Sequence, residues 1–391
     1  MNPLHLAAWA AALLLSSSLF AHTVALRLLL LLAGLGLVAV AIAKDRRALR
    51  LLPPLWIPLL LWAAWAVASL MWSIDPERTA KELRNEIGYS IGVFWLCFVA
   101  AQARGSARAF LPVLGAAGVL LCANAIYVAA PGAEGWFGGP GNLSSALLIL
   151  IPCASAAAWY GWHAAWPAVW RAAPIIVLVG SLAAGYSAQS RTFWVALSAQ
   201  VACTALLLFA QRAKVASRRA ASGLLAAAVV LGAAAMTLHV QSEREALGAH
   251  VIEEDPRLRL WQEVSERIEA RPWTGYGFGR GMLRVDLKNE LGKPQLWHAH
   301  NLFMDTALQL GVPGVVLLFA LLAAIFRQGW RLARDPSPRA AACGIALLAV
   351  LVGMLVRNMT DVLLIRQNAL LFWGVLGALL ALGMLPRQDT R

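Results

Sequence analysis

The sequence has few charged residues for its length. Only 14% of the 391 residues are Asp, Glu, Lys or Arg, whereas 60% are hydrophobic, and the mean hydropathy is +0.67. A soluble protein of this size would have too little polar surface to cover its core. The apolar residues form repeated runs of roughly 17 to 25 residues, the length of a helix across a bilayer, rather than the short alternating segments of barrel strands. The sequence therefore predicts an all-α integral membrane protein.

Paired or clustered cysteines are also missing. The net charge of +13 does not indicate a nucleic-acid-binding protein, because Lys and Arg lie mostly in short loops between apolar runs, where they set the topology. There is no Cys-x-x-Cys spacing, internal repeat or soluble domain in the sequence. The five cysteines all fall inside apolar runs, so we interpret them as packing residues: Cys97, Cys122, Cys153, Cys203 and Cys343.

About twelve transmembrane helices are expected, an even number that places both termini on one side of the membrane. Alternate loops carry clusters of Lys and Arg, which the positive-inside rule assigns to the cytoplasm. The opposite loops are short or carry both signs of charge, and the longest polar segment is one of them. We therefore expect helices 1 to 9 within residues 1–239, a large, partly helical outer loop over residues 240–310, and helices 10 to 12 within residues 311–391.

The densest group of ionisable residues lies near the end of this outer loop. Asn301 is expected to cap the helix that follows it, with Asp305 and Gln309 one turn apart on the same face. A histidine at a membrane edge is suited to act as a general base, because its unperturbed pKa is near neutral. His298 and His300 lie two residues apart, so on a helix only one of them would face a given site, and a bond to the backbone is the alternative for each.

A zinc site is the rival interpretation of the His-x-His pair. His239 and His250 are distant in the chain and the cysteines lie within the spans, so no third and fourth ligands stand out. We therefore expect no metal at this site.

Arginines form a second group, near the outer ends of the predicted spans. Arginine within hydrocarbon needs a partner, an interfacial position or a polar cavity, and a guanidinium binds phosphate oxygens in bidentate fashion. We interpret their recurrence as a binding site for an anion such as a pyrophosphate, although snorkelling or pairing with Asp361 explains any single one equally well. The residues are Arg27, Arg191, Arg357 and Arg366, joined in the long loop by Arg257 or Arg259.

The motif spacing resembles that of the bacterial O-antigen ligases, within the broader O-antigen ligase and polymerase superfamily. That family carries an arginine near the start of an outer-side span, which Arg191 matches. It also carries a His-Asn pair, nine intervening residues and Gly-x-x-Gly, matched here by His300, Asn301, Gly311 and Gly314. Its long-loop pattern of Arg, three residues, Trp and then Pro-x-x-Gly-x-Gly resembles Arg257, Trp261, Pro272, Gly275 and Gly277.

The resemblance implies a membrane-embedded, GT-C-like glycosyltransferase of lipopolysaccharide biosynthesis. Such an enzyme transfers O-antigen from undecaprenyl pyrophosphate to lipid A–core oligosaccharide at the periplasmic face of the bacterial inner membrane, with inversion and without a metal or other cofactor. The protein would be multi-pass with both termini cytoplasmic. Its partners would be this donor, this acceptor and the membrane lipids, with no nucleic acid.

Joined to the residues, the resemblance predicts a division of roles. His300 or His298 is expected to be the general base, Asp305 to orient it, and Arg191 with Arg257 or Arg259 to hold the pyrophosphate. The same motifs fit an O-antigen polymerase or a protein O-oligosaccharyltransferase, which use other acceptors. An anion transporter is the alternative from another class, but the inverted repeat that it would need is not evident in the sequence.

Overall fold

The computed structural model is all-helical in the part of the chain that it describes: residues 2–45, 49–128, 135–188, 190–210, 223, 256–291, 297–362 and 364–386. No strand occurs in these ranges, and eight of their helices are long and apolar enough to cross a membrane. The eight are α2 (Val24–Lys44), α6 (Ala107–Val128), α7 (Pro140–His163), α8 (Ala168–Ser187), α9 (Arg191–Ala210), α13 (Leu302–Ala333), α14 (Pro338–Arg357) and α15 (Arg366–Met384).

The predicted all-helical, multi-span architecture is confirmed. Three further predicted spans are shorter helices, namely α1 (Pro3–Ser17), α3 (Trp56–Ala68, continued by the 3-10 turn η2 at Ser69–Met71) and α5 (Tyr89–Ala100). The ninth predicted span, at 219–239, lies outside the described residues except for one position. The total of about twelve and the boundaries at 239/240 and 310/311 therefore stay predictions.

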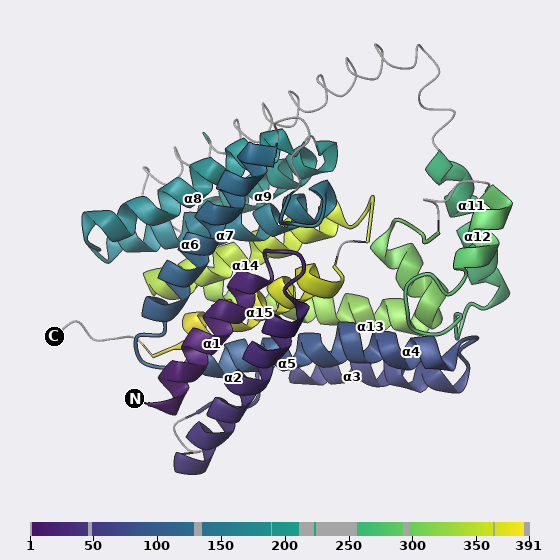
Figure 1. Ribbon diagram of the computed structural model, residues 1–391, viewed down its shortest axis with the longest axis horizontal. Coiled ribbons are helices and arrows are strands. Elements are labelled where there is room, and N and C mark those ends of the chain that lie inside the picture. Colours follow the sequence, from purple (N-terminus) through teal and green to yellow (C-terminus); the bar gives the residue numbers. More distant parts are fainter. Residues whose placement is uncertain are drawn as a thin grey trace, which may run out of the picture.

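The spans pack around one continuous apolar core. α15 packs against α5 and α14, while α14 also packs against α7, α9 and α13. Small residues allow the closest approaches: a Cβ on Gly377 of α15 would lie 2.3 Å from the carbonyl oxygen of Phe94 on α5. Figure 1 shows α11 and α12 at the right-hand end, beside the start of α13 and away from α6 and α8.

The long loop contributes two helices outside the spans. α11 (Pro256–Ala270) begins at the predicted proline, and its stripe residues Leu260 and Val264 are fully buried, so the predicted one-sided packing is confirmed. α12 (Arg284–Leu291) follows. These helices share a small core of their own with Tyr276, Leu283, Leu287, Ala299 and Leu308.

A proline inside α7 leaves a backbone carbonyl that another helix binds. Pro152 has no N–H, so the carbonyl of Leu148, four residues earlier, loses its helical partner. Nε2 of Gln200, on α9, donates to that carbonyl at 2.6 Å. Gly353 on α14 leaves room for the amide, because a Cβ there would lie 2.1 Å from this nitrogen.

α13 is interrupted at Gly311, where φ is +66° and ψ is −172°. The sequence predicts a helix over residues 302–310 and a break near Pro313 before the tenth span, and the structure confirms both. Val312 N–H donates to the Pro272 carbonyl at 2.7 Å instead of to Leu308, whose carbonyl accepts from Tyr276 N–H at 2.9 Å.

Pro272 and Tyr276 belong to a loop over residues 272–281, hereafter the glycine loop, and further bonds are made to the carbonyls at this break. The Gln309 carbonyl, which Pro313 deprives of a partner, accepts from Gly277 N–H at 3.0 Å. Nε1 of Trp65, on α3, donates to the Leu310 carbonyl at 3.0 Å. The freed carbonyls are thus all bound by protein groups, as the absence of water at membrane depth requires.

The motif glycines allow this close approach of two backbones. A Cβ on Gly275 would lie 2.5 Å from the carbonyl carbon of Gln309, and one on Gly311 would lie 2.6 Å from the Trp273 carbonyl. A Cβ on Gly277 would lie 2.3 Å from Ser73 Oγ, and one on Gly314 would lie 2.2 Å from Cβ of Leu310. Gly275, Gly277 and Gly311 also have positive φ, which side-chain-bearing residues rarely adopt.

We expect Gly275→Ala to lower the thermal midpoint of the detergent-solubilised protein, since the new Cβ meets backbone and the left-handed φ adds about 1–2 kcal/mol of strain. Gly115→Ala is the matched control, because a Cβ at that helical position meets nothing within 4 Å. The control should leave the midpoint unchanged or raise it slightly. Equal midpoints for Gly275→Ala and wild type would contradict the assigned close approach.

Candidate active site

The segment before α13 places both histidines next to the start of that helix. The side-chain oxygen of Asn301 accepts from the N–H groups of Phe303 at 3.0 Å and Met304 at 3.2 Å, so the predicted helix cap is confirmed. The Asn301 amide donates to the Met359 carbonyl at 3.1 Å. The start of α13 is thereby tied to the end of α14.

His300 has an unusual backbone conformation. Its φ is +49°, in the left-handed region. Its N–H donates to Nδ1 of His298 at 3.0 Å, and the two ring centroids are 3.8 Å apart. Strained backbone of this kind is concentrated at functional sites. This backbone conformation places the two rings next to each other.

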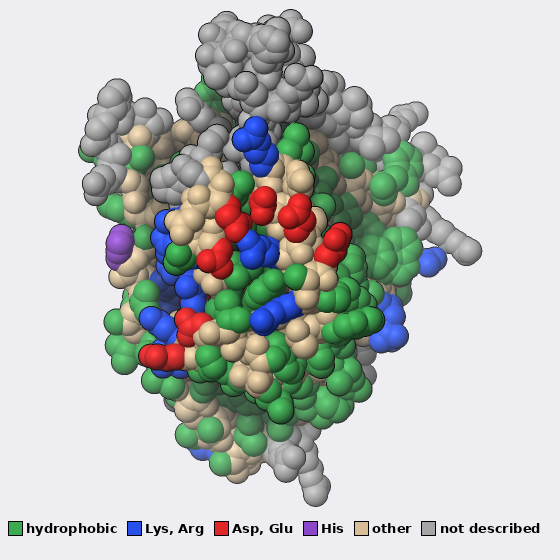
Figure 2. All heavy atoms as spheres, turned by 90° about the vertical axis from the view of Figure 1, so that its right-hand side faces the viewer, with side chains coloured by type: hydrophobic (Ala, Val, Ile, Leu, Met, Phe, Trp, Pro, Cys, Tyr) green, Lys and Arg blue, Asp and Glu red, His purple; other side chains and the backbone are tan. Residues whose placement is uncertain are grey.

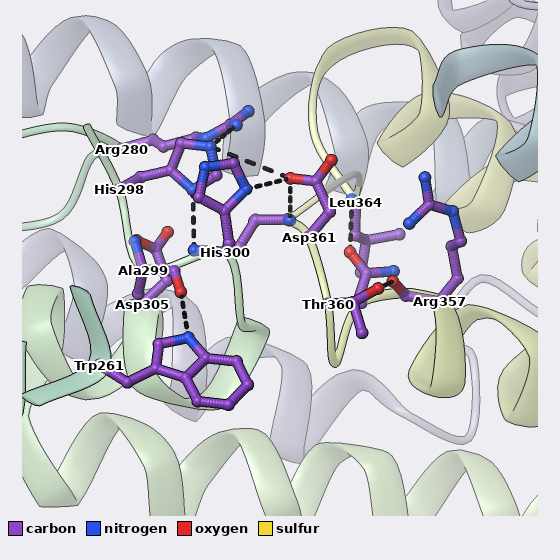
Figure 3. A network of polar contacts seen from close by, with 12 residues as sticks. Trp261, Arg280, His298, Ala299, His300, Asp305, Arg357, Thr360, Asp361 and Leu364 are labelled. Carbon is purple, nitrogen blue, oxygen red and sulfur yellow. Dashed lines mark hydrogen bonds and ion pairs between the residues drawn. The ribbon is translucent and has the colours of Figure 1, made fainter. Parts of the chain in front are cut away.

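Asp361, in the turn between α14 and α15, is the carboxylate that meets the histidine rings. Its Oδ1 lies 3.2 Å from Nδ1 of His300 and 3.9 Å from Nε2 of His298, and Figure 3 shows this convergence. The N–H of Val362 donates to the same oxygen at 2.8 Å. With Nδ1–H directed at Asp361, the neutral His300 ring carries its lone pair on Nε2.

Arg280, in the glycine loop, brings a positive charge into the cluster. Its Nη2 donates to Nε2 of His298, and its guanidinium lies over the Trp297 ring, 4.6 Å from the centroid. Its carbonyl accepts from Nη2 of Arg78, on α4 (Pro76–Glu82), at 2.9 Å. Both ring nitrogens of His298 therefore lie beside N–H groups, one from Arg280 and one from the backbone of His300, and the neutral ring accepts from one of them at a time.

Asp305 lies buried on the first turn of α13, beside the backbone between the two histidines. Its Oδ1 is 3.4 Å from the N–H of Ala299, and its Oδ2 accepts from Nε2 of Gln309 at 2.8 Å, which confirms the predicted pairing on one face. The Ala299 carbonyl accepts from Nε1 of Trp261 at 2.9 Å. Asp305 and Trp261 thus contact the backbone of Ala299, whereas the carboxylate that contacts the His300 ring is that of Asp361.

Burial and neighbouring charges set the protonation states. Burial, together with the positive charge of Arg280, lowers the pKa of His298 well below its ordinary value. Burial alone would raise the pKa of Asp361, but the hydrogen bond and the charge interaction with His300 outweigh it and hold that pKa low. The cluster therefore combines an ionised carboxylate with a neutral, buried imidazole.

The structure adds a third potential metal ligand to the His-x-His pair, namely Asp361 beside His298 and His300. One ligand atom from each lies within 4.8 Å of the other two. The Arg280 guanidinium, however, already donates to the His298 nitrogen. A divalent ion there would be repelled at close range by that charge, so the geometry favours a site whose resident cation is Arg280.

The end of the molecule next to this cluster is polar. Figure 2 shows acidic and basic side chains gathered together on this face, with hydrophobic side chains below them. The exposed charged residues of α11 and α12 include Glu266, Glu269, Arg284 and Asp286. Mixed charges of this density indicate surface in water rather than in hydrocarbon.

The arginines predicted to bind phosphate do not all meet at the histidines. Arg366 is exposed at the start of α15 and interacts electrostatically with Arg280. Arg357 is buried and its Nε donates to Ser144 Oγ at 3.3 Å. Figure 3 shows Arg357 on the other side of the turn that carries Asp361.

The remaining predicted arginines are less closely associated. Arg27 is buried in the first turn of α2, and its Nε has no hydrogen-bond partner among the described residues. Arg259 is exposed on α11. Arg191 is the first residue of α9 and Arg257 is the second residue of α11, but their side chains lie outside the described residues, so their roles stay predictions.

The sequence alone did not assign two residues of this region to the site: Arg280 and Asp361. Asp361 is the single acidic residue between Arg357 and Arg366, and it was considered only as an arginine partner. Arg280 stands between two glycines, Gly279 and Gly281, a signal that a charged side chain follows a tightly turned backbone. Their meeting with the histidines depends on packing between α13, α14 and the glycine loop, which no local pattern encodes.

Comparison with known proteins agrees with the resemblance seen in the sequence. A family model described as O-antigen ligase matches residues 175–319. The chain is also similar to an O-antigen ligase of Pseudomonas aeruginosa, with 24% identity over 293 residues, covering 73% of this chain and 67% of the relative. The predicted family resemblance is thereby confirmed. The matched segment includes both histidines and the motif glycines, whereas Asp361 lies beyond it.

Replacing Arg280 by Gln should raise the pKa of His298 toward its ordinary value, because the nearby positive charge that opposes protonation is removed while burial remains. The measurement is an NMR titration of histidine ring signals in the purified protein. Arg284→Gln is the matched control, since Arg284 also lies over the Trp297 ring, at 5.0 Å. An unchanged His298 titration in Arg280→Gln would rule out this electrostatic assignment.

Proposed function

We propose that this chain, whose residues 175–319 match the O-antigen ligase family, is a glycosyltransferase that moves O-antigen from undecaprenyl pyrophosphate onto lipid A–core oligosaccharide. The reaction would take place where α13, α14 and α15 meet, on the periplasmic face of the inner membrane. The observation that carries the proposal is the contact of His300 Nδ1 with Asp361 Oδ1, at 3.2 Å. It prepares the other ring nitrogen to accept a proton.

His300 is the better general base of the two histidines. Its side chain is 18% exposed, whereas that of His298 is only 2% exposed. The Asp361 contact directs the Nε2 lone pair of His300 away from the carboxylate, and the charge of Asp361 stabilises the imidazolium that forms when a proton is taken up. The sequence left open which of the two histidines is the base, and we propose His300.

His298 is proposed as a positioning residue. Its Nε2 faces Arg280 and its Nδ1 accepts from the His300 backbone, so neither nitrogen is directed at a substrate. It supports the strained backbone of His300 and holds Arg280 near the reacting groups. Asp305 acts one step further away, through the Ala299 backbone.

The proposed chemistry is a single displacement at the anomeric carbon. Nε2 of His300 takes the proton of an acceptor sugar hydroxyl as its oxygen attacks, and the bond from the anomeric carbon to the pyrophosphate oxygen breaks. The products are the new glycosidic bond and undecaprenyl pyrophosphate, which leaves with the bonding electron pair. Attack opposite the leaving group inverts the configuration, and the proton on His300 returns to solvent.

Arginine side chains are proposed to stabilise the leaving pyrophosphate. Arg280 contacts the histidine cluster and Arg366 interacts electrostatically with Arg280, and fixed guanidinium groups offset developing charge on phosphate oxygens without a metal. Arg191 and Arg257 or Arg259 remain candidates from the motif pattern. Arg27 and Arg357 are assigned a place farther along the donor rather than at the reacting bond.

His300→Ala in the purified protein should lower transfer by about 10²- to 10⁴-fold, the usual contribution of a general base. His298→Ala should retain much more activity, because that ring only positions its neighbours. The assay uses defined undecaprenyl-pyrophosphate-linked O-antigen and lipid A–core in nanodiscs. His163→Ala is the matched control, since that histidine lies exposed at the end of α7 and contacts Trp159 one turn earlier on the same helix.

The same assay separates the competing functions. Normal turnover by His300→Ala would eliminate it as the base. Loss of wild-type activity in EDTA, restored by a divalent ion, would instead establish a metal at His298, His300 and Asp361. Elongation of donor alone would identify a polymerase, and transfer to a pilin-like protein an O-oligosaccharyltransferase.

Asp361→Asn should lower the transfer rate on the order of 10²-fold while leaving the dissociation constant of the donor nearly unchanged. The amide can no longer stabilise the imidazolium or fix the Nδ1–H tautomer, yet it keeps the size of the side chain. Single-turnover rates and donor binding are measured separately. Asp335→Asn, at the opposite end of α13, is the control, and equal rates for Asp361→Asn and wild type would refute the His300–Asp361 pair.

A further inference from the structure

Glu86 is an acid outside the histidine cluster that contacts the start of α15. It belongs to η3 (Leu83–Gly88), a π-helical turn between α4 and α5. Turns of this kind are rare within helices and frequently occur at functional sites. Its Oε2 accepts from the backbone N–H of Arg366 at 2.8 Å, so a side chain from one end of the chain binds the first residue of α15.

Arg366 needs this support because its backbone is strained. Its φ is +49°, in the left-handed region, at the first residue of a 19-residue helix. Its N–H is one of the helix-start groups without a helical partner. The Glu86 carboxylate satisfies that group and therefore fixes where the Arg366 side chain leaves the helix.

Charged groups from three elements face Glu86. Arg366 comes from α15, Arg280 from the glycine loop and Glu82 from α4. Of the other packed helices, α3 carries no titratable side chain, and Tyr89 begins α5 directly after η3. Glu86 is thus an acid whose charge interacts with both arginines proposed to hold the pyrophosphate.

The Glu86 carboxyl changes its protonation state close to neutral pH. Burial raises its pKa from the ordinary value to about 7, against the opposing effects of the Arg366 N–H and of the positive charges on Arg366 and Arg280. An anion that binds to these arginines adds negative charge nearby and makes the ionised carboxylate still less favourable. Protonated Glu86 still offers a carbonyl oxygen to the Arg366 N–H.

We propose that Glu86 is a positioning residue that couples donor binding to the uptake of one proton. Ionised Glu86 pairs with Arg280 and Arg366 while the site is empty. When the donor diphosphate arrives, Glu86 takes a proton from solvent, becomes neutral and leaves both guanidinium groups to the phosphate oxygens. The proton returns to solvent when undecaprenyl pyrophosphate leaves. This inference rests on the proposed donor site.

The experiment measures binding of undecaprenyl pyrophosphate to the full-length protein in phosphatidylcholine nanodiscs between pH 6 and pH 8. Wild-type affinity should fall about five- to tenfold over this range, because one more proton has to be bound with the ligand as the pH rises. Glu86→Gln, which mimics the neutral acid, should bind at pH 8 about as tightly as wild type does at pH 6. Any titration of the ligand itself affects both proteins equally.

Two further variants complete the test. Glu82→Gln removes the same charge one turn away and should keep the wild-type pH slope, while Glu86→Asp should keep a slope with a shifted midpoint. Identical slopes for wild type and Glu86→Gln would overturn the Glu86 proposal and leave the donor site intact. Weak binding by Glu86→Gln at every pH, with an unchanged thermal midpoint, would also overturn it, since the carboxylate would then be required in its ionised form. Failure of the wild type to bind at any pH would refute the donor site and this inference together.

Discussion

Hydrocarbon offers no hydrogen-bond donors, so every carbonyl freed by a helix break has to be bound by the protein itself. The break at Gly311 meets this requirement by an exchange of partners: Val312 bonds to Pro272, and the carbonyls of Leu308 and Gln309 bond to the glycine loop. That exchange fixes the loop on α13. Because the loop carries Arg280, the interrupted helix determines where a positive charge meets the histidines.

Charge balance then decides what each histidine does. Burial and the charge of Arg280 keep His298 neutral, while Asp361 faces the adjacent ring of His300. Two imidazoles whose centroids are 3.8 Å apart therefore have different chemical environments. The difference arises from elements on opposite sides, the glycine loop on one and the turn between α14 and α15 on the other. A single pair of residues in the sequence thus receives one structural and one reactive role.

The sequence predicted those features whose signals are local. The helical class follows from the length of the apolar runs, the Asn301 cap from a side chain beside its own helix, and the break near Gly311 from Pro313. Asp361 and Glu86 could not be assigned in the same way, because their partners lie far away in the chain and meet them only through helix packing. The helical turns at residues 302–310 followed from the Asn301 cap, although they bury Asp305 and Thr306 and lack the continuous apolar pattern of a span. Arg357 was grouped with the site because it lies near the end of its helix, although that helix directs it toward Ser144.

The bond from Gln200 to the Leu148 carbonyl has a consequence for the evolution of this membrane bundle. Pro152 creates the need for a donor, Gln200 supplies it, and Gly353 leaves the space that the amide fills. A lineage that replaced the proline would restore the helical bond to the Leu148 carbonyl. The buried amide of Gln200 would then have to share that acceptor or remain unpaired, which is unfavourable in an apolar environment. A larger residue at 353 would in turn displace that amide. These three positions, on three different helices, are therefore expected to covary among relatives as one unit.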